Sequence, residues 1–130
     1  ELEAAIRDGA SSIGADITDW SVGAVHADGD DSRGGHLFMV EFAGGQPSPD
    51  RIAHFVKTVD AALAETNEDY EAHRSGGFGM RAPEAVAVPP GTFAAWMKSR
   101  GQLGGQHKVP RVINDAELFE GLRSFVADRS

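Results

Sequence analysis

The 130-residue sequence contains no cysteine, which excludes several kinds of chemistry. Disulfide bonds, thiolate metal sites and cysteine nucleophiles are ruled out, and a reducing compartment is permitted. Long apolar runs are also missing, since no stretch approaches the roughly 20 residues needed to cross a bilayer. No basic and apolar signal region opens the chain. We therefore expect a cytoplasmic protein that does not associate with membranes.

Basic residues are scarce relative to acidic ones. Twelve lysines and arginines stand against 20 aspartates and glutamates, which gives a formal net charge of −8. A protein that grips nucleic acid needs a basic surface, so nucleic acid is not expected as a partner. The chain has the 41% of hydrophobic residues typical of globular proteins and is long enough for one compact domain. We expect a single domain over residues 1–130.

The spacing of apolar residues predicts helices and strands that share one small sheet. Helical periodicity and strand-like runs follow one another in the order helix, strand, strand, helix, strand, helix, strand, helix. This order predicts an α+β fold with a mixed β-sheet of about four strands and helices packed mainly against one face. The predicted elements cover residues 2–13, 20–26, 36–42, 48–65, 83–88, 92–100, 109–113 and 114–126.

Local signals place the ends and the inward faces of several helices. Ser48 precedes a proline and an aspartate and is the predicted N-cap of the long helix. Thr92 is predicted to cap the next helix, whose stripe of Phe93, Trp96 and Met97 is assigned to the core. In the last helix, the residues expected to face inward are Leu118, Leu122, Phe125 and Val126.

Two patterns invite a metal-site interpretation, and both are weak. The acidic loop over 27–35 lacks the sixth-position glycine and twelfth-position glutamate of an EF-hand, because Arg33 and Met39 stand there. His26 and His36 are placed to face each other across a hairpin, but no third ligand is evident. We predict no metal site.

The segment whose residues suggest a functional site is 104–111, in which two glycines precede Lys108. Glycine lets the backbone come close to an anion, and an ammonium on such a turn can reach a phosphate. The spacing differs from that of a P-loop, so a solvated surface lysine remains the alternative. Arg111 follows three residues later, and the sequence leaves open whether it faces the same side or forms a surface ion pair.

Short motifs along most of the chain resemble, in the same order, the C-terminal domain of the auxin-responsive acyl-acid amido synthetases of the Gretchen Hagen type. The stretch over 36–41 also resembles the strand that precedes the long helix in that family. The most specific motif is Gln-x-Lys-x-Pro-Arg over 106–111. The matching residues are Asn67, Tyr70, Arg74, Pro83, Glu84, Val86, Val88, Gly91, Thr92, Phe93, Ser99, Arg100, Gly101 and 106–111.

This resemblance implies an adenylate-forming ligase. A large N-terminal domain, absent from this chain, would bind ATP with Mg²⁺ and a carboxylic acid, and the C-terminal domain would close over them as a lid. Lys108 matches the family's lysine that reaches the α-phosphate, and Gln106 and Arg111 are expected to bind the phosphate beside it. The implied partners are the N-terminal adenylation domain, a carboxylic acid and an amino acid. The 130-residue domain is expected to bind neither ATP nor Mg²⁺ alone, and to be inactive by itself.

A second hypothesis is a free-standing regulatory or small-ligand-binding module of ferredoxin-like build, in which Lys108 is only a surface residue. The helical pattern at the start of the chain and the missing initiator methionine favour the first hypothesis, a piece of a longer protein. The acidic loop over 28–35 and the glycine stretch over 75–79 match nothing characteristic of the plant enzymes. The acyl and amine substrates therefore stay open.

Overall fold

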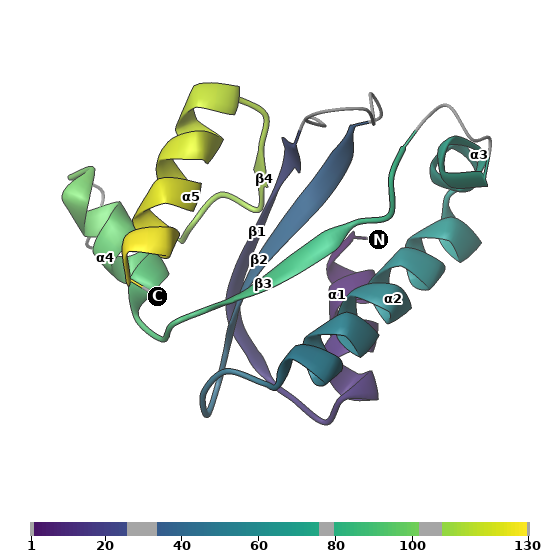
Figure 1. The fold of residues 1–130 in the computed structure, drawn as a ribbon, viewed down its shortest axis with the longest axis horizontal. Helices are drawn as coiled ribbons and strands as arrows, with labels where there is room; N and C mark the ends of the chain where they lie inside the picture. Colours follow the sequence, from purple (N-terminus) through teal and green to yellow (C-terminus); the bar gives the residue numbers. More distant parts are fainter. Residues whose placement is uncertain (1, 26–33, 76–79, 102–107, 130) are drawn as a thin grey trace.

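The computed structural model describes residues 2–25, 34–75, 80–101 and 108–129. Five helices and four strands lie in these ranges, and their order along the chain can be followed in Figure 1. The elements are α1 (Leu2–Ser12), β1 (Ile17–Val25), β2 (Gly35–Phe42), α2 (Pro49–Thr66), α3 (Glu68–Ser75), β3 (Glu84–Val88), α4 (Thr92–Ser99), β4 (Val112–Ile113) and α5 (Ala116–Arg129).

The strands form one mixed sheet in the order β3-β2-β1-β4. β1 and β2 pair antiparallel, whereas β3 pairs parallel with β2 and β4 pairs parallel with β1. The predicted α+β class and the four-stranded mixed sheet are confirmed. The order of the described elements differs from the β-α-β-β-α-β order of ferredoxin-like folds, so that build, expected under the second hypothesis, is wrong.

Helices cover both faces of the sheet (Figure 1). α1 and α2 pack on one face and α4 and α5 on the other, and each face has its own hydrophobic cluster. The expectation of helices mainly on one face is therefore wrong. The reason lies in β2, where Phe38 and Val40 point to the α1–α2 face while Leu37 and Met39 point to the α4–α5 face. A nearly unbroken apolar strand is typical of a sheet that is covered on both sides.

A glycine brings α1 close to α2. Gly9 lies inside α1 and is buried, and a Cβ at this position would lie 2.7 Å from Cγ2 of Val59 and 2.9 Å from Cδ1 of Phe55. Its helix propensity is poor, but its missing side chain permits the close approach. The predicted end of this helix is confirmed, because Gly14 follows it with a φ of 65°.

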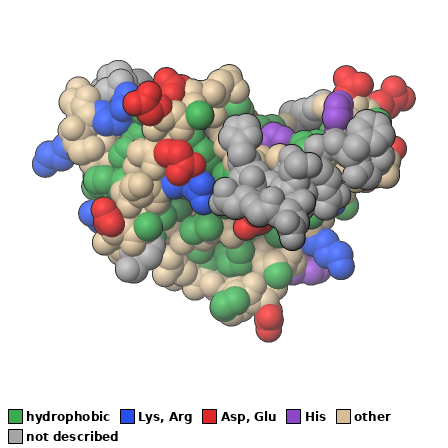
Figure 2. All heavy atoms as spheres, turned by 45° about the horizontal axis from the view of Figure 1, so that its top comes forward, with side chains coloured by type: hydrophobic (Ala, Val, Ile, Leu, Met, Phe, Trp, Pro, Cys, Tyr) green, Lys and Arg blue, Asp and Glu red, His purple; other side chains and the backbone are tan. Residues whose placement is uncertain are grey.

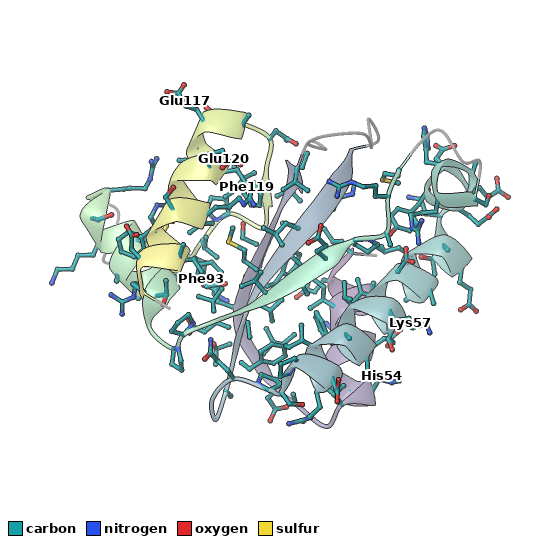
Figure 3. All side chains as sticks on the ribbon, viewed as in Figure 1. His54, Lys57, Phe93, Glu117, Phe119 and Glu120 are labelled. Carbon is teal, nitrogen blue, oxygen red and sulfur yellow. The ribbon has the colours of Figure 1, made fainter. Side chains whose placement is uncertain are left out.

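A second glycine lets α5 lie on β1. A Cβ at Gly23 would lie 2.5 Å from the ring of Phe119, whose side chain is 1% exposed. In Figure 3, Phe119 projects from α5 toward the sheet, and Phe93 of α4 lies below it in this view. The predicted inward face of α5 is confirmed for Leu122 and Val126, whereas Leu118 and Phe125 are only partly buried and Phe119, which was not predicted, is buried in the core.

The helix caps agree with the sequence in one case and differ in another. Ser48 is the N-cap of α2, and its hydroxyl accepts a hydrogen bond from the Arg51 amide at 3.3 Å. The N-cap of α4 is Gly91, in a left-handed conformation, so the prediction of Thr92 is wrong. Thr92 is fully buried, and its hydroxyl accepts a hydrogen bond from Nε of Arg129 at 3.1 Å.

Charged side chains are spread over the surface. On the face shown in Figure 2, acidic and basic groups are scattered among apolar ones, and acidic groups stand out at the end where α3 lies. The first turn of α3 contains Glu68, Asp69 and Glu71, and carboxylates at this end of a helix interact favourably with the positive end of its dipole. No helix among the described residues is long and apolar enough to cross a membrane.

Candidate functional site

The segment that carries Lys108 is fixed along the edge of the sheet. Val109 is 2% exposed and belongs to the α4–α5 core. The hydroxyl of Ser21 donates to the Pro110 carbonyl at 2.6 Å, and the Val22 amide donates to the Arg111 carbonyl at 2.8 Å. The backbone that follows Lys108 is thereby held against β1 for its whole length up to β4.

Arg111 is held by two residues at the start of β1. Its Nη1 donates to the Asp19 carboxylate and, at 3.0 Å, to the Trp20 carbonyl. Its guanidinium also lies 4.9 Å from the centroid of the Trp20 ring, which is a cation–π contact. The ion pair left open by the sequence is thus present, and it joins the two chain segments 92 residues apart.

Lys108 and Arg111 line the same pocket. The pocket has a volume of about 430 Å³, and its other walls come from α1, from the residues that join α1 to β1 and from the start of β1. The Lys108 side chain is exposed and makes no ion pair with any residue that the structure describes. Lys108 is therefore available to an incoming anion, whereas the guanidinium of Arg111 already has a carboxylate partner.

The same pocket contains charges of both signs. Arg7 lies on its α1 wall and pairs with Glu3 at 4.0 Å, but both side chains are more than 70% exposed, so this pair contributes little. Asp16 adds a second carboxylate to the lining. Of the basic groups in this lining, Lys108 is the one that makes no ion pair with a described residue. Gln106, the third predicted phosphate ligand, lies outside the described residues.

A hydrogen-bonded cluster joins α2 to α3 away from this pocket. Arg74 makes a two-pronged pair with Asp60 at 2.8 and 2.7 Å, and the Tyr70 hydroxyl donates to Asp60 at 2.6 Å. The hydrogen bond from Arg74 is the main reason that the pKa of Asp60 is lowered. Burial, followed by the bond to Asp60, raises the pKa of Tyr70. This cluster includes two residues of the family resemblance, Tyr70 and Arg74, and neither lines the Lys108 pocket.

Comparison with known proteins decides the family. The model of the GH3 family C-terminal domain matches residues 1–117. The chain belongs to the GH3 family. The resemblance predicted from the short motifs is thereby confirmed, since the matched range includes all of them.

Solved structures of GH3 proteins have the same fold as this GH3 domain. A structure of the GH3.15 acyl acid amido synthetase matches 98% of the chain with a TM-score of 0.75 and 20% identity. A structure titled AtGH3.15 acyl acid amido synthetase in complex with 2,4-DB matches 96% with a TM-score of 0.71, also at 20% identity. The chain spans 22% and 23% of the length of these two proteins. No curated protein matches the chain significantly.

The described part of the GH3 domain holds no group of three or more histidine, cysteine, aspartate or glutamate residues that could bind a metal ion. His26 and most of the acidic loop lie outside the described residues. His36 lies on the α1–α2 face of the sheet, where burial lowers its pKa. The prediction of no metal site at the hairpin therefore remains a prediction.

Sequence reasoning missed the partners of Arg111 in this GH3 domain. Asp19 and Trp20 were not singled out, because nothing in the sequence connects them with a residue 92 positions later. The α1 wall of the pocket was missed for the same reason. Asp60, the carboxylate at the centre of the α2–α3 cluster, was not singled out either, because its partners Tyr70 and Arg74 lie on the next helix.

Proposed function

We propose that this domain is the lid of an ATP-dependent acyl acid amido synthetase, and that Lys108 contacts the phosphate of the acyl adenylate. The observation that carries the proposal is the state of Lys108: exposed, without an ionic partner among the described residues, and on a backbone fixed to β1. Membership of the GH3 family and the fold shared with the GH3.15 acyl acid amido synthetase support it.

The chemistry fits an ammonium group on a fixed backbone. Attack of a carboxylate on the α-phosphorus of ATP forms the acyl–phosphate bond, breaks the bond to pyrophosphate and concentrates negative charge on the phosphoryl oxygens. A cation placed there stabilises this charge more in the transition state than in the ground state. Because Val109 and Pro110 are anchored, the backbone that follows Lys108 does not have to order when the phosphate arrives, which lowers the entropic cost of the contact.

The remaining parts of the reaction belong to the rest of such an enzyme. A larger domain would bind ATP with Mg²⁺ and the carboxylic acid, since this chain spans only about a fifth of the GH3 relatives. Gln106 stays a predicted phosphate ligand. Arg111 also stays a predicted ligand, but it can reach a phosphate only by exchanging or sharing its bond to Asp19. The domain alone is expected to be inactive.

The test is acid-dependent exchange of pyrophosphate into ATP by the enzyme that contains this domain. Lys108→Ala is compared with Lys98→Ala, which removes an exposed lysine in the last turn of α4. Exchange should fall in the first variant and stay at the wild-type rate in the second. If both variants exchange at the wild-type rate and keep the wild-type circular dichroism, the proposed role of Lys108 is wrong. Exchange that does not depend on any carboxylic acid would contradict the proposal that the enzyme is an acyl-adenylating ligase.

A further inference from the structure

A second pocket lies on the α1–α2 face and shares no lining residue with the Lys108 pocket. Its volume is about 250 Å³. Val22 and Phe38, which are cross-strand neighbours in β1 and β2, lie on its sheet side, and Leu63 of α2 forms a wall. Val112 also lines it, and with 51% exposure it is one of two large apolar side chains exposed among the described residues.

One wall of this second pocket is built rigidly. It is formed by the Tyr70 side chain, whose hydroxyl donates to Asp60 at 2.6 Å. Asp60 is in turn held by both prongs of Arg74. Asn67 also lines the pocket, and its side chain accepts a hydrogen bond from the Tyr70 amide at 3.1 Å. Three motif residues that the proposed function does not use therefore shape this pocket or fix its wall.

The polar groups of the lining differ in what they can still bind. Tyr70 and Asn67 already have hydrogen-bond partners. The ring of His36 makes no hydrogen bond with any described residue, and it is partly buried beside Phe38. A neutral imidazole offers one donor and one acceptor. The described lining contains no lysine or arginine, so a buried anion would lack a counter-charge.

We propose that this pocket binds a small, uncharged and mostly apolar molecule whose single hydroxyl group hydrogen-bonds to His36. The apolar body of the ligand contacts Val22, Phe38 and Leu63, which form a preformed apolar surface of the kind that small-molecule sites present. The site is separate from the Lys108 pocket and does not depend on the proposed ligase activity.

The test uses para-cresol as the probe and toluene as its matched analogue without the hydroxyl. Both are titrated into the ¹⁵N-labelled 130-residue chain and followed by amide chemical shifts. Para-cresol should shift residues around the pocket saturably and bind about two- to tenfold more tightly than toluene, the contribution expected of one net hydrogen bond. Absence of saturable shifts with para-cresol, or equal affinity for the two probes, would overturn the proposal.

Variants separate recognition by His36 from general apolar binding. His36→Phe should lower the affinity for para-cresol to that for toluene, and the control His54→Phe should change neither, because His54 is exposed on α2 and points away from the sheet (Figure 3). Val112→Trp, at an exposed position, should block both probes without unfolding the chain. Unchanged para-cresol affinity in both pocket variants refutes the site. Loss of para-cresol binding in a longer enzyme that contains this domain would show that another domain fills the pocket. That result would also overturn the proposed ligand site.

Discussion

Gly23→Ala tests the packing of α5 on the sheet, because the added methyl group has nowhere to go. It would lie 2.5 Å from Cγ and Cδ1 of Phe119 and 2.6 Å from Cδ2. Favourable carbon–carbon contacts are about 3.5 to 4.0 Å, so the ring or the strand must retreat by about 1 Å. The Phe119 ring is 1% exposed and is surrounded by the α4–α5 core, so the retreat strains its neighbours.

The expected loss of stability follows from two opposing terms. Overpacking of a core costs about 1 to 3 kcal/mol. Alanine is favoured over glycine in a strand by about 0.5 to 1 kcal/mol, which offsets part of that cost. We expect Gly23→Ala to lower the free energy of unfolding by about 1 to 2 kcal/mol. With a urea m-value of about 1 to 2 kcal/mol/M, the midpoint should fall by about 1 M.

The assay is urea unfolding followed by far-ultraviolet circular dichroism, with two comparisons. Gly121→Ala is the control, because this helical glycine on α5 is exposed and a Cβ there meets nothing within 4 Å, so the variant should be slightly more stable. Phe119→Leu should relieve the clash, so the double variant with Gly23→Ala should be less destabilised than the sum of the single ones. A Gly23→Ala midpoint equal to that of wild type would refute the placement of α5 over β1.

Two further predictions concern ion pairs. Asp60→Asn should cost about 1 to 3 kcal/mol, because Arg74 and Tyr70 lose a charged acceptor. Since the folded-state pKa of Asp60 is lowered from 3.8, this stability is present above pH 4 or so and is lost as the pH falls through the folded value. Thermal unfolding should show the gap between wild type and Asp60→Asn narrowing in acid, and a constant gap would contradict the cause assigned to the shift. Arg111→Lys should lower the free energy of unfolding by about 0.5 to 1.5 kcal/mol, because an ammonium group cannot make the hydrogen bonds of the guanidinium and its contact with the Trp20 ring at the same time. An unchanged urea midpoint would contradict this prediction.

The sequence predicted the elements well because their signals are local. Four helices and four strands lie at or near their predicted ranges, and Ser48 caps α2 as expected, whereas α3 has no place in the predicted order and β4 is shorter than predicted. Features that depend on tertiary contact were not predictable. Gly9 and Gly23 are close-packing positions in the structure, and neither role can be recognised from the sequence, because the neighbouring side chains come from other elements. Thr92 read as a cap because of its residue type, but its burial and its bond to Arg129 come from the packing of α5.

The candidate site was predictable only as a segment. The resemblance around Lys108 pointed to a stretch that lies within the residues matched by the family, and the role of Lys108 stays a prediction. The Asp19 and Trp20 contacts of Arg111 and the α1 wall of the pocket require the fold, since they come from the other end of the chain. Charge counting could not show that Arg111 is paired while Lys108 has no ion pair among the described residues, because the pairing depends on which strand lies beside each residue.

The central claim is that Lys108 stabilises the phosphate during adenylate formation. Its most direct test is the rate of acid-dependent pyrophosphate exchange by the enzyme that contains this domain, for wild type, Lys108→Ala and Lys108→Arg. Loss of one such contact typically costs about 2.7 to 4 kcal/mol, so Lys108→Ala should exchange about 100 to 1,000 times more slowly. Lys108→Arg should retain part of the wild-type rate, because the guanidinium keeps the positive charge but is larger and planar. A folded Lys108→Ala enzyme that exchanges at the wild-type rate would contradict the account.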